Sequence, residues 1–211
     1  MNPQSQGVVF KETKSAQGAL SLDLAVVVGE DGLLLGYWAP AVKVGGVIVE
    51  ASEVHIQLPD GRRAEAKLLA AKPELSLALF QVPLDGLGPV TFRDEPVRVG
   101  ESVTVLTAVR DKKGSPRIIE RSGKVTALYP RGWEGRKAWQ IEMSTPLKGG
   151  GGPVLDARGR VVGMMMGDRQ PPDKRQGTGL PYRSYAISVA LLRPLLEGAA
   201  SGQRPAGSEE I

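Results

Sequence analysis

Residues 148–163 read KGGGGPVLDARGRVVG, and this stretch decides how the rest of the chain is interpreted. The four consecutive glycines, 149–152, permit a tight backbone path because glycine tolerates positive φ angles and the close approach of other atoms. Pro153 and a short apolar segment follow, and the run of valines and methionines at 161–166 predicts a strand. We therefore expect a tight, glycine-built loop that leads into β-structure.

Composition points to a β-rich protein. The chain has 211 residues, with 27 glycines and 16 prolines, which is typical of many short strands joined by turns. Hydrophobic residues make up 41% and aromatic residues 5%, so the core must be built from valine, leucine and alanine. The absence of cysteine excludes disulfides, thiolate metal sites and a cysteine nucleophile. No stretch approaches the roughly 18 apolar residues of a membrane-spanning helix.

Short apolar or alternating segments recur between turn signals, and one segment, 189–197, has the leucine spacing of a helix. This pattern predicts an all-β antiparallel barrel architecture with a C-terminal helix. We expect one folded unit over 1–198, with a division near 83–100, and a flexible tail or linker over 199–211. The predicted strands are 24–28, 33–35, 54–58, 64–71, 77–82, 103–109, 123–129, 139–143, 161–166 and 184–187.

The order of the motifs resembles the trypsin-like serine proteases, and more narrowly the HtrA (Deg) type, from about residue 24 to residue 196. The glycine loop is similar to the family's nucleophile loop, Gly-(Asp/Asn)-Ser-Gly-Gly-Pro-Leu. The resemblance implies a fold of two antiparallel six-stranded β-barrels followed by a C-terminal helix. The similar segments are, in chain order, 31–35, 58–62, 76–80, 99–103, 122–127, 149–153 and 185–192.

The three catalytic positions implied by this resemblance are all substituted. Ala39 stands where the family has histidine, Ser76 where it has aspartate, and Gly150 where it has the serine nucleophile. A triad needs an attacking hydroxyl, an imidazole base and a carboxylate that orients the imidazole. None of the three positions carries the group that its role requires. Neighbouring residues such as Pro40 and Lys148 also depart from the family pattern, as natural divergence would produce. We therefore expect a pseudoprotease without catalytic residues.

A hydrolase with displaced catalytic groups is the competing interpretation, with Ser76, Ser144 or Lys148 as candidates. The only histidine, His55, lies in the predicted strand 54–58, and the resemblance does not bring it to the cleft. One histidine and no cysteine argue against a dedicated transition-metal site, so we expect neither a metal nor a cofactor.

Several residues are candidates for binding instead of catalysis. The glycines 149–152 permit the backbone path of an oxyanion hole, or the loop could be too flexible to form one. Gly149, Gly150, Gly151 and Lys148 are binding candidates in this loop. Met164 and Met166 could line a peptide groove along an edge strand, or could simply pack in the core. The rings of Tyr37 and Trp38 could plug the emptied cleft or form an aromatic patch for a partner.

These observations favour a non-catalytic domain that binds a protein or peptide, or acts as a scaffold, within a larger assembly or homo-oligomer. The net charge is 27 − 23 = +4. Residues 110–137 carry an excess of lysine and arginine, which makes anion or nucleic-acid binding the alternative; a solvated loop is the simpler explanation. The family resemblance implies an extracytoplasmic, periplasmic location, although the N-terminal residues do not read as a signal peptide.

Overall fold

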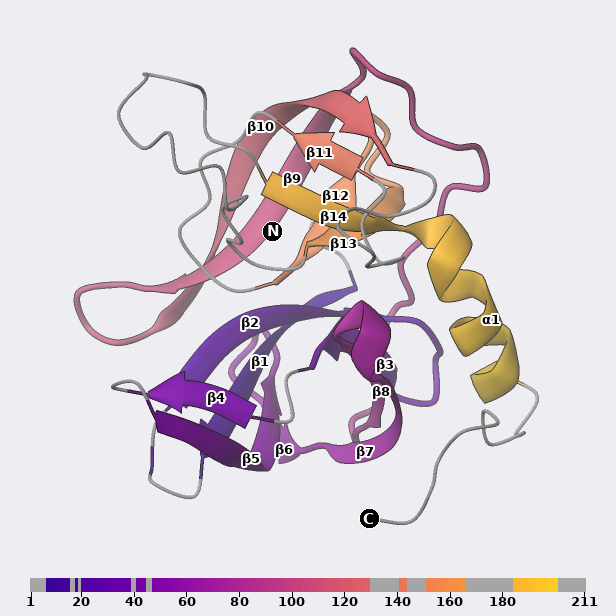
Figure 1. Cartoon of the computed structure of the whole chain (residues 1–211). Helices are drawn as coiled ribbons and strands as arrows, with labels where there is room; N and C mark the ends of the chain where they lie inside the picture. The colour runs from indigo at the N-terminus through magenta and orange to yellow at the C-terminus, as the bar shows by residue number, and fades with distance from the viewer. Residues whose placement is uncertain are drawn as a thin grey trace.

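The computed structural model describes residues 7–15, 18, 20–38, 41–44, 47–129, 141–143, 151–165 and 184–200. Figure 1 shows two β-structures stacked on one another and a helix, α1 (Val189–Ala200), along one side of both. The strands of the first half are β1 (Val8–Ser15), β2 (Leu20–Val27), β3 (Leu33–Tyr37), β4 (Ala41–Val44), β5 (Val47–Gln57), β6 (Arg63–Glu65), β7 (Lys67–Lys72) and β8 (Leu77–Gln81). Those of the second half are β9 (Ser102–Arg110), β10 (Pro116–Leu128), β11 (Ile141–Met143), β12 (Pro153–Leu155), β13 (Val161–Met165) and β14 (Ser184–Ser188).

The N-terminal half is an eight-stranded antiparallel sheet with the order β4-β5-β1-β2-β3-β8-β7, in which β6 pairs with β5. Only Ala66 separates β6 from β7, so the continuous segment 63–72 pairs with β5 at its start and with β8 at its end. This segment bridges the two sides of the sheet and curls it into a half-barrel. The C-terminal half is a closed barrel with the order β10-β11-β14-β13-β12-β9. The predicted all-β fold with two antiparallel barrel units and a C-terminal helix is therefore confirmed.

Three apolar clusters fill this architecture, because side chains alternate between the two faces of each strand. The first occupies the interior of the N-terminal half-barrel and includes Ile56 and Phe80. The second fills the closed barrel and includes Val105 and Ile141. The third and largest lies between the two halves, where Leu24 meets residues of β9, β13, β14 and α1. The site described below lies at the border of this middle layer.

The sequence pattern missed β1, although six consecutive residues of this strand are buried. Lys11, Glu12 and Thr13 interrupt the apolar run, so the segment reads as polar and does not resemble a core strand. Each of these buried polar side chains has a hydrogen-bonding partner within the fold. The pattern also missed β4 and β12, which are four and three residues long, and it joined β6 and β7 into one predicted strand, 64–71. The predicted helix 189–197 is observed with a slightly later end, and the hydroxyl of Ser188 accepts the N–H of Ala190 at its start.

The connection between β8 and β9 is held against the closed barrel. Phe92 forms a parallel β-bridge with Val161, and the N–H of Arg93 donates to the Val161 carbonyl at 2.9 Å. The guanidinium of Arg93 pairs with Glu101 and lies 3.7 Å from Asp156. These contacts fix the connection as an outer layer of the C-terminal half. Among the described residues, no helix is both long and apolar enough to cross a membrane.

Candidate functional site

Of the three positions that the resemblance aligns with the family's catalytic residues, the structure describes one, Ser76. Ala39 and Gly150 lie outside the described residues, together with Ser144 and the binding candidates Lys148, Gly149 and Met166. The chain neighbours Trp38 and Gly151 are described, so the surroundings of the site can be built from them.

Ser76 links the start of β8 to the end of β3. It ends the short 3₁₀ helix Pro73–Leu75, and its φ of 50° and ψ of 38° place it in the left-handed region. The Ser76 N–H donates to the Pro73 carbonyl at 3.0 Å, and the Ser76 carbonyl accepts the N–H of Trp38 at 2.9 Å. The backbone of the aspartate position therefore lies beside the strand that leads into Ala39. A hydroxyl at this position has no charge with which to stabilise an imidazolium.

The end of the glycine run belongs to the C-terminal barrel and lies beside the end of β3. The Gly151 carbonyl accepts the N–H of Leu24 from β2 at 2.9 Å, which joins the two halves through a backbone hydrogen bond. A Cβ placed on Gly151 would lie 2.8 Å from the Cβ of Tyr37 and 2.9 Å from the Met165 carbonyl oxygen. A Cβ on Gly152 would overlap the carbonyl oxygen of Leu106. Both glycines are buried, and both are required because other backbone atoms approach them closely.

Three segments far apart in the sequence thus meet at the border of the two halves: the end of β3, the start of β8 and the end of the glycine run. Tyr37 pairs with Leu77 in the β3–β8 register and contacts Gly151 on its other side. Ser76 and the chain neighbours of Ala39 and Gly150 lie in these three segments. The described side chains at this junction, a serine, two aromatic rings and glycines, include neither an imidazole nor a carboxylate.

The two rings at this junction have different surroundings. Trp38 packs edge to face on Phe80, with ring centroids 5.9 Å apart, and is part of the apolar cluster inside the N-terminal half-barrel. Tyr37 is partly buried and lies against Gly151. The packing of Trp38 favours a role in filling the half-barrel, whereas Tyr37 occupies the border with the glycine run.

Met164 is fully buried in the layer between the two halves, and Met165 is fully buried inside the closed barrel. This burial favours core packing, the simpler of the two roles considered for the methionines. A groove along β13 would have to rely on residues beyond Met165.

His55 lies on β5, and two strands, β1 and β2, lie between β5 and β3 in the sheet order. Its register partners are Glu12 on β1 and Glu65 on β6, whereas its neighbours Val54 and Ile56 point into the half-barrel. The side chain of His55 therefore lies on the outer face of the sheet. Because His55 is the only histidine of the chain, the junction beside Ser76 receives no imidazole from another part of the sequence.

A buried ion pair inside the N-terminal half-barrel was not foreseen from the sequence. Lys11 is 2% exposed; its Nζ lies 3.3 Å from Asp23 Oδ2 and donates to Thr13 Oγ1 at 2.9 Å. Burial lowers the pKa of Lys11, and the charge of Asp23 opposes that shift. The cross-strand register places Lys11 directly opposite Asp23, so a correct prediction of β1 and β2 would have suggested the pair.

Two further carboxylates are buried away from the junction. Glu12 pairs with Arg63 and Arg110, and Glu142 accepts hydrogen bonds from three hydroxyls, those of Thr126, Tyr129 and Tyr185. Within the described ranges, no cluster of three or more histidine, cysteine, aspartate or glutamate side chains is arranged to hold a metal ion.

Comparison with known proteins agrees with this architecture. Residues 23–164 match the trypsin-like peptidase domain. The uncharacterized protein y4bJ of Sinorhizobium fredii is 34% identical over 125 residues, which cover 56% of this chain and 19% of that protein. A probable periplasmic serine endoprotease, DegP-like, of Ectopseudomonas mendocina is 28% identical over 152 residues, 69% of this chain and 29% of that protein. The chain thus spans less than a third of the length of these curated relatives.

Solved structures share the fold at low sequence identity. The HtrA-type protease AlgW, solved with a tripeptide, has a TM-score of 0.71 and 22% identity, covering 94% of this chain and 62% of that chain. The Rv3671c protease from M. tuberculosis has a TM-score of 0.70 and 16% identity, covering 100% of this chain and 87% of that chain. The family match covers more than half of the sequence, and the two-barrel fold supports it. The chain therefore belongs to the trypsin-like peptidase domain family.

Proposed function

We propose that this trypsin-like domain is a proteolytically inactive member of its family that acts as a protein-binding or scaffold module. The observation that carries the proposal is the position of His55. The only imidazole of the chain lies on the outer face of β5, whereas the junction of the three catalytic segments lies at the end of β3. Without a base, a serine hydroxyl near pH 7 is a weak nucleophile.

The backbone of the junction supports a binding role. Gly151 is joined to β2 by a hydrogen bond, and Met165 donates to the Gly152 carbonyl at 2.8 Å, so the end of the glycine run is well anchored. A protease fold that keeps this framework retains a surface on which a peptide can be held without being cleaved. The structural neighbour AlgW was solved with a tripeptide, an example of a short peptide held by a protein of this fold.

The inactivity is tested with two assays on the full chain, using trypsin as the positive control. We expect no cleavage of unfolded casein and no covalent labelling by a fluorophosphonate probe. If labelling were observed, Ser76→Ala and Ser144→Ala would identify the reacting hydroxyl. Labelling that disappears in either variant would overturn the proposal in favour of displaced catalytic groups.

The binding role requires a separate measurement. An array of immobilised peptides should include sequences that bind the full chain with a saturable dissociation constant and remain intact after incubation. Tyr37→Ala is the informative variant because Tyr37 contacts the glycine run, and Leu69→Ala on β7 is a matched control outside the junction. A complete lack of peptide binding, or equal loss in both variants, would contradict binding at the junction.

A further inference from the structure

The strands β9 and β10 form a long two-stranded ribbon at one side of the molecule (Figure 1). Nine residue pairs, from Arg110 with Pro116 to Lys124 with Ser102, define its register. The ribbon extends beyond the part of the barrel where β10 pairs with β11, and basic side chains occupy many of its exposed positions. The exposed basic residues are Arg110, Lys112, Lys113, Arg117, Arg121 and Lys124.

The turn end of this ribbon is tied to the N-terminal half by a buried carboxylate. Glu12 is 5% exposed and lies between two guanidinium groups. Its Oε2 accepts a hydrogen bond from Arg63 at 2.7 Å, and its Oε1 accepts one from Arg110. Arg110 also donates to the Gly114 carbonyl at 3.0 Å within the ribbon turn. A guanidinium held in this way loses little further freedom when it binds an anion.

The ribbon keeps a clear excess of positive charge. Residues 110–124 contain six lysines and arginines and two acidic residues, so the net charge is 6 − 2 = +4. One of the two acids, Asp111, shapes the turn: its Oδ1 accepts the N–H groups of Lys113 and Ser115 at 2.8 and 2.9 Å. Its Oδ2 lies 3.5 Å from Arg117 Nε, and the Arg117 side chain nevertheless remains 72% exposed. The surface that results is cationic and turned to solvent.

The composition of the ribbon indicates which anion it suits. Residues 102–128 contain no aromatic residue, so they offer no ring on which a nucleotide base could stack. They also contain no asparagine or glutamine, the side chains that read adenine in the major groove. Arginine and lysine remain, and an arginine fork matches a carboxylate with two parallel hydrogen bonds.

We propose that this basic ribbon binds an acidic segment of a partner protein, with Arg117 and Arg121 as the central contacts. The inference rests on the proposed protein-binding function and specifies the partner's chemistry. Arg117 and Arg121 lie on one face of β10, four residues apart, which corresponds to about 13 Å along a strand. Two carboxylates at a similar separation on an extended peptide would pair with both.

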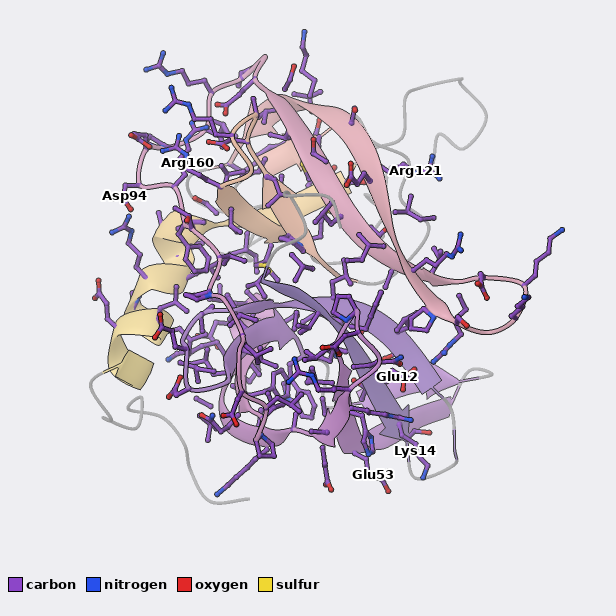
Figure 2. All side chains as sticks on the ribbon, turned by 180° about the vertical axis from the view of Figure 1, so that it is seen from behind. Glu12, Lys14, Glu53, Asp94, Arg121 and Arg160 are labelled. Atoms are coloured by element: carbon purple, nitrogen blue, oxygen red, sulfur yellow. The ribbon has the colours of Figure 1, made fainter. Side chains whose placement is uncertain are left out.

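The test uses the full chain and a fluorescent oligo-glutamate peptide at physiological ionic strength. The double variant Arg117→Gln/Arg121→Gln should weaken binding at least about tenfold, because each lost group made a charge-assisted hydrogen bond. The matched control Lys67→Gln/Arg158→Gln removes the same charge from β7 and from the β12–β13 turn. In Figure 2 that turn, marked by Arg160, lies on the opposite side from Arg121. We expect the control to bind within twofold of the unchanged chain.

Three results would overturn the inference. The first is no saturable binding of the peptide by the unchanged chain. The second is an equal loss in the double variant and in its control, because only the net charge would then matter. The third is tighter, ribbon-dependent binding of a DNA duplex of similar charge, which would assign the ribbon to nucleic acid. The fluorophosphonate assay does not depend on these three results. If the chain is inactive and its ribbon binds nothing, the ribbon inference is refuted and the proposed inactivity is not.

Discussion

The side chain of Tyr37 lies so close to Gly151 that a methyl group on the glycine would sit 2.8 Å from the Tyr37 Cβ. This contact joins the end of β3 to the glycine run and therefore connects the two halves of the fold. The same glycine accepts a backbone hydrogen bond from Leu24, and the next one, Gly152, lies against the carbonyl oxygen of Leu106. The glycine run is thus a structural contact between the halves whether or not it serves a ligand.

We expect Gly152→Ala to be more destabilising than Gly151→Ala. The new Cβ at 152 would overlap the Leu106 carbonyl of β9, whereas a Cβ at 151 would lie 2.8 Å from the Tyr37 Cβ and 2.9 Å from the Met165 carbonyl oxygen, so the overlap at 152 is the larger. The losses in unfolding free energy should be about 1–3 kcal/mol for Gly151→Ala and larger for Gly152→Ala. Urea denaturation followed by circular dichroism measures both losses. The opposite ranking would contradict the packing described for the glycine run.

The left-handed backbone of Ser76 makes a second prediction. Among the described residues, Ser76 is the one residue other than glycine with a positive φ. Asparagine tolerates this region and a β-branched residue does not, so Ser76→Asn should be nearly neutral and Ser76→Val should cost about 1–3 kcal/mol. Thermal or urea unfolding of the two variants decides the matter. Equal stability of the asparagine and valine variants would show that the turn can relax.

The buried pair of Lys11 and Asp23 should respond very differently to single and double replacement. Asp23→Ala leaves an unpaired ammonium inside the half-barrel and should lower the unfolding free energy by about 3–5 kcal/mol. Lys11→Met/Asp23→Leu replaces both charges by apolar groups and should be nearly neutral or stabilising. The comparison requires unfolding curves for the chain and for both variants. A double variant as unstable as the single one would mean that the polar interior is needed for folding.

The Arg93–Glu101 pair predicts a loss of stability in acid. The hydrogen bond from Arg93 lowers the pKa of Glu101, and the N–H of Arg98 adds to this effect. The folded pKa then lies below the unfolded value of about 4.3, so the stabilisation is complete above that pH and is lost as the pH falls toward the folded pKa. Urea unfolding between about pH 6 and pH 3 should show a steeper loss for the unchanged chain than for Glu101→Gln.

A second carboxylate in the same network serves as the comparison. Burial raises the pKa of Asp156, but hydrogen bonds from the N–H groups of Arg160 and Arg158 and from the Arg160 guanidinium outweigh it, and the net shift is downward. Glu101→Gln should therefore reduce the acid sensitivity without abolishing it. An identical pH dependence in the chain and in Glu101→Gln would show that this pair does not contribute.

The fold could be predicted from the sequence because most of its strands are apolar or alternating segments between turn signals and its motifs appear in order. The helix and most long strands follow directly from that pattern. The strand β1 was not found, since its buried Lys11 and Glu12 give it the composition of a surface segment. Their partners, Asp23 and Arg110, come from other strands, and pairing across a sheet cannot be derived from one strand's periodicity.

The candidate site was found only in outline for a similar reason. The motif order identified Ser76 and the glycine run, but whether a side chain faces a groove or a core depends on the neighbouring strands. Met164 is fully buried and Trp38 packs on Phe80, and neither outcome follows from residue type. The contacts of the buried Glu12 with Arg63 and Arg110 were missed because the carboxylate and the two arginines are 51 and 98 positions apart.

The lysine inside the half-barrel has a consequence for how this sequence can vary. Its Cδ would lie 3.3 Å from a Cβ at position 36, so the long side chain of Lys11 fits because Gly36 has none. We therefore expect the two positions to covary: a homologue with alanine at 36 should carry a shorter residue at 11. Covariation of these two columns among close homologues would record the history of the buried charge.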